Sequence, residues 1–282
     1  GYRAATRPSR GAGGTIRGRQ PEGRRYHRWR RAAQHAGVGA VSAPFGQWRV
    51  KTRAGLPSML PPVEKLEAML GALGIQRSDT LVITMTGFGA GEMATAARVY
   101  WTLKLLGHEQ VAILNGGLSA FAGDKARATQ LTAVPFQRPA SSYKAEPNLS
   151  LLADADSTLA GVNKGEQMID ARSTAEYLGI HVSGEKERAG TLPKARNLPF
   201  DWLTENGSAM LLPTERLGTL MQAIGVDASA PQVHFCHSGN RAALSWFVSY
   251  ALLGNQQARL YDGSMLEWGI RPELPMERQV TF

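Results

Sequence analysis

The single cysteine of this chain lies where a strand-like run meets a helix-like run. Cys236 is the only cysteine among 282 residues. The run 233–235 is β-prone, and from Arg241 onward the apolar residues recur with helical spacing. A turn of this kind points backbone N–H groups inward, and the positive end of the helix dipole lies nearby. Because both favour the nucleophilic thiolate, the sequence predicts a reactive Cys236 in preference to a buried structural one.

The residues that follow the cysteine are assigned to substrate binding or loop support: His237, Ser238, Gly239, Asn240 and Arg241. Ser238 could donate a hydrogen bond to a substrate or cap the next turn. His237 and Asn240 are expected to point outward, and a contact between His237 and substrate stays open. Arg241 could attract an anionic substrate, but an anchoring role through carboxylates is favoured.

A second candidate comes from a neighbouring strand. The run Gln167–Asp170 is typical of a buried strand, and parallel sheets present functional groups where their strands end. We therefore expect Asp170 to support the cysteine loop. The residues Ser173 to Glu176 have the spacing of a capping box, which predicts that a short helix opens there.

The cysteine segment resembles the active half of a two-domain rhodanese sulfurtransferase. The resemblance rests on Cys-His-Ser-Gly-Asn-Arg-Ala at 236–242, Leu-Leu-Gly at 252–254 and Leu-Tyr-Asp-Gly-Ser-Met-Leu-Glu-Trp at 260–268. It covers about residues 57–282 and is densest in the last 50. It implies a cysteine that takes a sulfane sulfur from a donor, holds it as a persulfide in a six-residue loop, and passes it to an acceptor without a cofactor.

The length of the loop separates this family from its nearest rival. Cysteine phosphatases have a similar arrangement but place five residues between cysteine and arginine, because their loop cradles a phosphate. Four residues separate Cys236 from Arg241. The count favours sulfur transfer. A phosphatase and a non-catalytic rhodanese-fold carrier or interaction module stay as alternatives.

The resemblance also bears on the sulfur donor. Relatives place basic residues that hold the donor's negative charge in the polar stretch 181–188, which here contains Lys186 and Arg188. Relatives that use 3-mercaptopyruvate have a loop serine, matched by Ser238, and a histidine where this chain has Ser58. Thiosulfate is therefore the favoured donor, with 3-mercaptopyruvate left open.

The order strand, loop, helix, strand occurs twice in the chain. Met85 falls where Cys236 falls, and the first copy has four more residues, which we assign to its loop. A thioether cannot hold a persulfide, so the first copy is predicted to be an inactive structural half. The expected fold is α/β, with two rhodanese-like domains that each have a mainly parallel sheet flanked by helices. The predicted divisions are a basic arm (1–54), the inactive domain (55–124), a linker (125–147) and the catalytic domain (148–282).

The positive charge is confined to the start of the chain. The net charge is +9, but residues 1–50 alone carry +10, with eleven arginines and one glutamate. A disordered arm, an organelle transit peptide and a non-native stretch are the three interpretations. The remainder is nearly neutral, which does not favour a nucleic-acid partner, and the resemblance implies a small-molecule sulfur donor and a thiol or cyanide acceptor as partners. We expect no nucleic acid, membrane or metal, a monomer or weak dimer, and a cytoplasmic location, or a mitochondrial one if the arm is a transit peptide.

Overall fold

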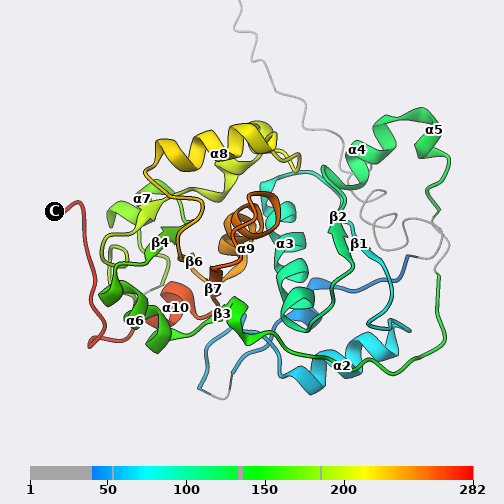
Figure 1. Cartoon of the computed structure of the whole chain (residues 1–282), viewed down its shortest axis with the longest axis horizontal. Helices are drawn as coiled ribbons and strands as arrows, with labels where there is room; N and C mark the ends of the chain where they lie inside the picture. Colours follow the sequence, from blue (N-terminus) through cyan, green and yellow to red (C-terminus); the bar gives the residue numbers. More distant parts are fainter. Residues whose placement is uncertain (1–39, 53, 133–135, 185, 282) are drawn as a thin grey trace, which may run out of the picture.

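The computed structural model describes residues 40–52, 54–132, 136–184 and 186–281. Most of the predicted basic arm, residues 1–39, lies outside the described residues. The described chain is an α/β structure with two parallel sheets, and helices flank both (Figure 1). This confirms the predicted α/β class with parallel sheets flanked by helices.

A five-stranded parallel sheet forms the centre of the second half. Its strands lie in the order β3 (Leu152–Ala153), β7 (Ala258–Tyr261), β6 (Gln232–Phe235), β4 (Gln167–Asp170) and β5 (Arg196–Asn197). All four residues of β6 are buried. A central parallel strand is covered on both faces, so even the polar residues Gln232 and His234 of β6 are buried.

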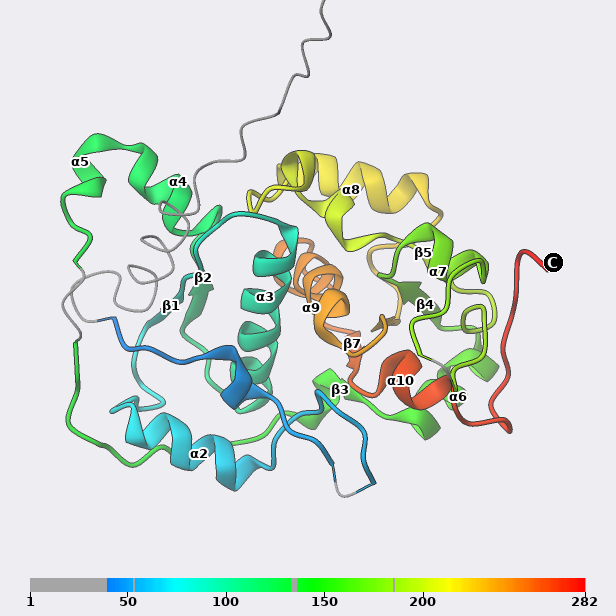
Figure 2. The ribbon, with the colours of Figure 1, turned by 180° about the vertical axis from the view of Figure 1, so that it is seen from behind.

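Helices surround this sheet on both sides (Figures 1 and 2). They are α6 (Ala155–Lys164), α7 (Thr174–Leu178), α8 (Thr214–Ala223), α9 (Asn240–Phe247) and α10 (Ser264–Trp268). Short 3₁₀ turns lie at Leu149–Leu151, Phe200–Leu203 and Glu205–Gly207. α9 continues as a π-helical turn, Val248–Leu252, and the chain then reverses at Gly254, whose φ is +78°. The predicted capping box is present, since Ser173 and Glu176 cap each other's backbone at the start of α7.

The first half contains a smaller sheet of two parallel strands, β1 (Leu81–Ile83) and β2 (Val111–Ile113). Its helices are α2 (Val63–Ala72), α3 (Ala90–Leu105), α4 (Gly117–Gly123) and α5 (Lys125–Ala128), and a 3₁₀ turn spans Phe45–Trp48. The order strand, loop, helix, strand predicted for this half is confirmed by β1, α3 and β2.

The predicted arm extends too far into the chain. Trp48 is 2% exposed and packs with Leu66, Leu70 and Leu103, so residues 40–52 belong to the core of the first half. Val50 also pairs with Met59 in an antiparallel bridge. The high arginine content of residues 1–50 concealed this short apolar run.

The predicted linker packs along the first half. Tyr143 is buried and contacts His108, and Ser141 bonds to the backbone at Gly71 and Ile75. Asn148 then bonds to the carbonyl of Leu105, at the end of α3. Residues 141–148 are thus held against the first half.

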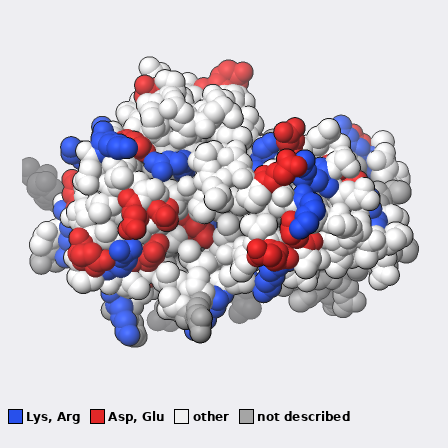
Figure 3. Space-filling model, turned by 60° about the horizontal axis from the view of Figure 1, so that its bottom comes forward, with Lys and Arg blue, Asp and Glu red and all other residues white. Residues whose placement is uncertain are grey.

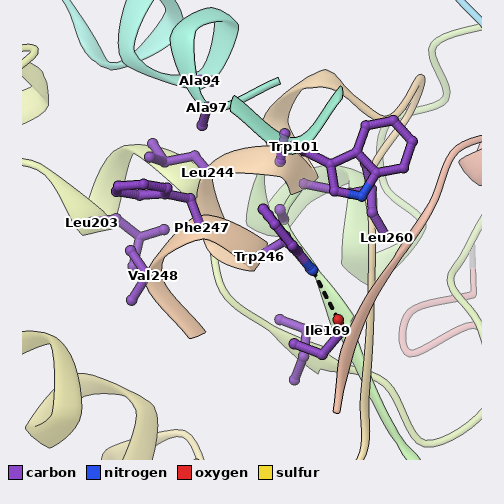
Figure 4. Close-up of a cluster of buried hydrophobic side chains, with 14 of the residues drawn as sticks. Ala94, Ala97, Trp101, Ile169, Leu203, Leu244, Trp246, Phe247, Val248 and Leu260 are labelled. Atoms are coloured by element: carbon purple, nitrogen blue, oxygen red, sulfur yellow. Dashed lines mark hydrogen bonds between the residues drawn. The ribbon is translucent and has the colours of Figure 1, made fainter. Parts of the chain in front are cut away.

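The two halves meet through α3 and α9, which lie side by side in both ribbon views (Figures 1 and 2). Ala94 and Ala97 of α3 let the helices approach, and Trp101 and Trp246 fill the space beside them (Figure 4). The indole N–H of Trp246 donates to the carbonyl of Ala258 at 2.9 Å, the dashed line in Figure 4. One continuous core therefore joins the helix after the cysteine to the first half.

The surface carries charges of both signs. On the face in Figure 3, basic and acidic side chains are interspersed. In the described part of the chain, no helix combines the length and the apolar character needed to cross a bilayer.

Candidate active site

Cys236 directly follows β6, and α9 begins four residues later at Asn240. The turn between them depends on Gly239, which has φ of +73°. A Cβ at this position would lie 2.5 Å from Nη1 of Arg98 and 2.9 Å from the carbonyl oxygen of Asp262. Both the left-handed conformation and the close approach require glycine. The predicted turn between strand and helix is thus present.

The backbone around the cysteine is held by the first turn of α10. The carbonyl of Cys236 accepts from the N–H of Met265 at 3.0 Å, and that of His237 accepts from Leu266 at 2.9 Å. The Cys236 N–H donates to Oγ of Ser264 at 3.1 Å. Ser264 is fully buried and has a φ of +48°, an uncommon value for serine. Sequence reasoning missed Ser264, although the run that contains it carried part of the resemblance.

The amides of the loop are free. The N–H groups of His237, Ser238, Gly239 and Asn240 find no acceptor within the described residues. The Cys236 side chain is 1% exposed, and the side chains at 237, 238, 240 and 241 are partly exposed. Free N–H groups beside a buried sulfur at a helix N-terminus form an anion-binding environment.

Arg241 is anchored by a carboxylate that sequence reasoning did not assign to the site. Its Nη1 and Nη2 donate to the two oxygens of Glu176 at 2.7 and 2.8 Å. Burial alone would lower the pKa of Arg241, but the bonds to Glu176 and the nearby negative charges of Cys236 and Asp170 raise it above its ordinary value. Arg241 thus stays charged within electrostatic range of the sulfur.

The ion pair with Arg241 also lowers the pKa of Glu176. Burial alone would raise the pKa of Glu176, but its hydrogen bonds and charge pairing with Arg241, together with Ser173, hold the pKa well below its ordinary value. Glu176 also accepts from Ser183 at 3.1 Å. A single carboxylate therefore joins the start of α7, the stretch after it, and the loop arginine.

Asp170 lies at the end of β4, opposite Phe235, the residue before Cys236. Its carboxylate pairs with Arg172 and accepts from the hydroxyl of Thr191 at 2.8 Å. The carboxylate has no hydrogen bond to an amide of the loop within the described residues. Its influence on the loop is therefore electrostatic, through Arg241, together with the alignment of two neighbouring strands.

The polar stretch 181–188 contacts the cysteine loop through a carboxylate, that of Glu187. Glu187 contacts Nε2 of His237 at 2.8 Å. Lys186 is exposed. Arg188 donates to the carbonyl oxygens of Trp268, Gly269, Arg271 and Leu274. The structure therefore places the Arg188 guanidinium on the C-terminal segment and not at the cysteine.

The first half repeats the geometry of the loop with methionine in place of cysteine. The Met85 carbonyl accepts from Leu118 and that of Thr86 from Ser119 in the first turn of α4, both at 2.9 Å, as Cys236 and His237 accept from successive residues in the first turn of α10. The register that aligns Met85 with Cys236 therefore holds. The placement of the extra residues was wrong: three residues separate Met85 from the cap Gly89 and two separate Cys236 from Gly239, so the loop itself gains one. The rest lie in the longer α3.

In the first half, a glutamate side chain binds the amides of the equivalent loop. Oε2 of Glu92 accepts from the N–H groups of Gly87 and Phe88 at 2.6 and 3.1 Å, and Oε1 bonds to the hydroxyl of Thr86. Counted from the two helix caps, the equivalent of Glu92 in the second half is Ala242. The same turn thus binds a carboxylate in one copy and leaves its amides open beside Cys236 in the other.

The segment that would carry a catalytic histidine has Ser58, which is partly exposed with φ of +65°. The residues after Ser58 contact the second half close to the cysteine loop, since the Leu60 N–H donates to the carboxylate of Asp262 at 2.7 Å. Two cavities of about 530 and 640 Å³ are lined by other residues, Arg77 and Trp202 among them, and not by the cysteine loop. Among the described residues, no group of three or more metal-ligating side chains is present.

Comparison with known proteins agrees with this geometry. Residues 154–270 match the family model described as a rhodanese-like domain. The chain is 31% identical over 237 residues to a Mycobacterium bovis protein named "Putative thiosulfate sulfurtransferase 1", and the match covers 82% of each chain.

Solved structures show the same fold. SseA from Escherichia coli, whose structure is titled as a 3-mercaptopyruvate sulfotransferase, matches with a TM-score of 0.63 and 27% identity over 76% of this chain and 78% of that one. The Tum1 protein from Saccharomyces cerevisiae matches with a TM-score of 0.72 and 21% identity over 88% and 85%. The fold and the cysteine loop define a rhodanese-type sulfurtransferase. This chain belongs to the rhodanese-like sulfurtransferase family.

Proposed function

We propose that this sulfurtransferase moves the sulfane sulfur of thiosulfate to a thiol or cyanide acceptor through a persulfide on Cys236. The observation that carries the proposal is the set of free amides around a buried cysteine at the start of α9. The loop of the first half supports it, because the same backbone turn there binds the carboxylate of Glu92.

The reaction takes two displacements. The Cys236 thiolate attacks the outer sulfur of thiosulfate, the S–S bond of the donor breaks, and sulfite leaves with the electron pair. The product is a persulfide, whose terminal sulfur carries the negative charge near the loop amides and Arg241. An acceptor anion such as cyanide then attacks that sulfur, thiocyanate forms, and the cysteine thiolate is regenerated.

Each named residue has a part in this scheme. The amides of residues 237–240 stabilise the anionic sulfur in both states. Arg241, fixed by Glu176, adds a permanent positive charge. Ser238 and His237 lie at the partly exposed side of the loop, where a donor approaches. Lys186 is the exposed cation from 181–188 that we assign to the donor's sulfite group, and Asp170 keeps its role in loop support.

Thiosulfate is proposed over 3-mercaptopyruvate because the chain has Ser58 where mercaptopyruvate-using relatives were expected to have histidine. The test measures thiocyanate release with each donor at equal concentrations, for the wild type and for Cys236→Ser. We expect turnover with thiosulfate that the serine variant lacks. Hydrolysis of para-nitrophenyl phosphate without thiocyanate release would instead indicate a phosphatase, and a folded protein inactive in both assays would indicate a carrier.

A further inference from the structure

A buried arginine from the inactive half reaches the cysteine loop. Arg98 lies in the middle of α3 and is 1% exposed. Its Nη1 donates to the carbonyl of Gly239 at 3.3 Å, and its Nη2 forms an ion pair with Asp262, the residue after β7. The guanidinium also lies 4.6 Å from the centre of the Trp101 ring. The loop is therefore held from the first half as well as from its own domain.

Asp262 connects this arginine to two other parts of the site. Its second oxygen accepts the N–H of Leu60 at 2.7 Å, and it stands two residues before Ser264, which bonds the Cys236 N–H. Asp262 is 4% exposed, so neither charge of the pair is solvated. A pair that is buried to this degree fixes both side chains, because separating them would leave an uncompensated charge.

The bond to Gly239 sets the direction of one loop amide. The Gly239 carbonyl and the Asn240 N–H belong to the same planar trans peptide and point in opposite directions. Arg98 draws the carbonyl toward itself, so the N–H points away from Arg98. Residues of α10 draw the carbonyls of Cys236 and His237 outward in the same manner, which orients the amides of His237 and Ser238.

We propose that Arg98 is a positioning residue for sulfur transfer, which acts from the inactive half by holding the Gly239 peptide so that the Asn240 N–H faces the anionic sulfur. This inference rests on the function proposed above. It gives the first half a task in the chemistry, although that half has methionine at its own cysteine position.

The test compares Arg98→Lys, the double variant Arg98→Met with Asp262→Asn, and a control, Arg77→Met. The control removes an arginine of the same half whose ion pair with Glu146 is exposed. Three quantities are measured: the pH at which iodoacetamide alkylation of Cys236 is half-maximal, kcat and KM with thiosulfate and cyanide, and thermal unfolding.

In the double variant we expect kcat to fall about tenfold, because one preorganised donor is lost. The alkylation midpoint should rise relative to the wild type, because one hydrogen-bond donor to the thiolate is lost. KM for thiosulfate should change less than about twofold, since Arg98 is buried and binds no donor. A lysine can hold Asp262 but not Gly239 as well, so Arg98→Lys should show smaller changes of the same sign.

A folded double variant with the wild-type alkylation midpoint and kcat would overturn the proposal, even if its melting temperature fell. If the double variant does not fold, unchanged alkylation and kcat in Arg98→Lys would overturn it. The alkylation measurement does not depend on turnover. A wild type that transfers no sulfur would therefore refute the proposed function separately.

Discussion

Glu176 and Arg241 form a two-pronged ion pair that joins the first turn of α7 to the last residue of the cysteine loop. The side chains are 7% and 25% exposed. The same carboxylate closes the capping box with Ser173, so one side chain serves a helix end and the loop together.

Glu176→Gln should destabilise the protein by about 2–4 kcal/mol, because the variant leaves Arg241 partly buried without its counter-charge. Urea unfolding at pH 7 measures this change. Asp79→Asn is the matched control, since its pair with Arg138 is more exposed and should contribute less than about 1 kcal/mol. Equal losses in the two variants would contradict the anchoring role.

The contribution of Glu176 should also depend on pH. The pKa of Glu176 is depressed in the folded state, so its stabilising effect is fully present above the ordinary value of 4.5 and is lost as the pH falls toward the folded value. The difference in unfolding free energy between wild type and Glu176→Gln should therefore shrink below about pH 4.5. A difference that grows on acidification would contradict this assignment.

Lys186 and Arg188, which the sequence grouped together, should behave differently. Arg188→Ala removes the donor of four main-chain bonds and should lower stability by about 2–3 kcal/mol, which thermal unfolding can detect. Lys186→Ala should leave stability within about 0.5 kcal/mol and raise KM for thiosulfate. The reverse pattern, a stable Arg188→Ala with a raised KM, would place Arg188 at the donor.

His234 should make the protein sensitive to mild acid. It is fully buried within β6, and burial lowers its pKa to about 3. The unfolded chain takes up a proton below about pH 6.5 and the folded chain does not, so the His234 contribution is present above that pH and falls as the pH drops. Between pH 6.5 and 5.0 the wild type should lose about 1–2 kcal/mol more than His234→Asn. Parallel pH profiles would show that His234 is protonated in the folded state.

The local structure of the site could be predicted because its signals lie close together in the sequence. A short buried strand, a glycine in the turn, and a helical pattern after Arg241 place the cysteine, and Asp170 ends its strand as expected. The strand β3 and helix α6 were missed. α6 opens with a capping box of Asp154 and Ser157, which was not singled out within the predicted catalytic domain.

The partners of the site residues could not be predicted, because they come from distant parts of the chain. Glu187, Glu176 and Arg98 lie 50, 65 and 141 residues from the loop atoms that they bind. Periodicity and caps report on contacts within a few residues, whereas these bonds depend on how elements pack. The one visible signal was Arg98, an arginine in the middle of the mostly apolar run that forms α3.

The central claim is that Cys236 carries the transferred sulfur. Intact-mass measurement after brief incubation with thiosulfate tests it most directly, because a persulfide adds one sulfur, about 32 Da, to the chain. We predict this adduct in the wild type, its loss on addition of cyanide with release of thiocyanate, and its absence in Cys236→Ser. An adduct that persists in Cys236→Ser, or a wild type that turns over thiosulfate without any adduct, would contradict the account.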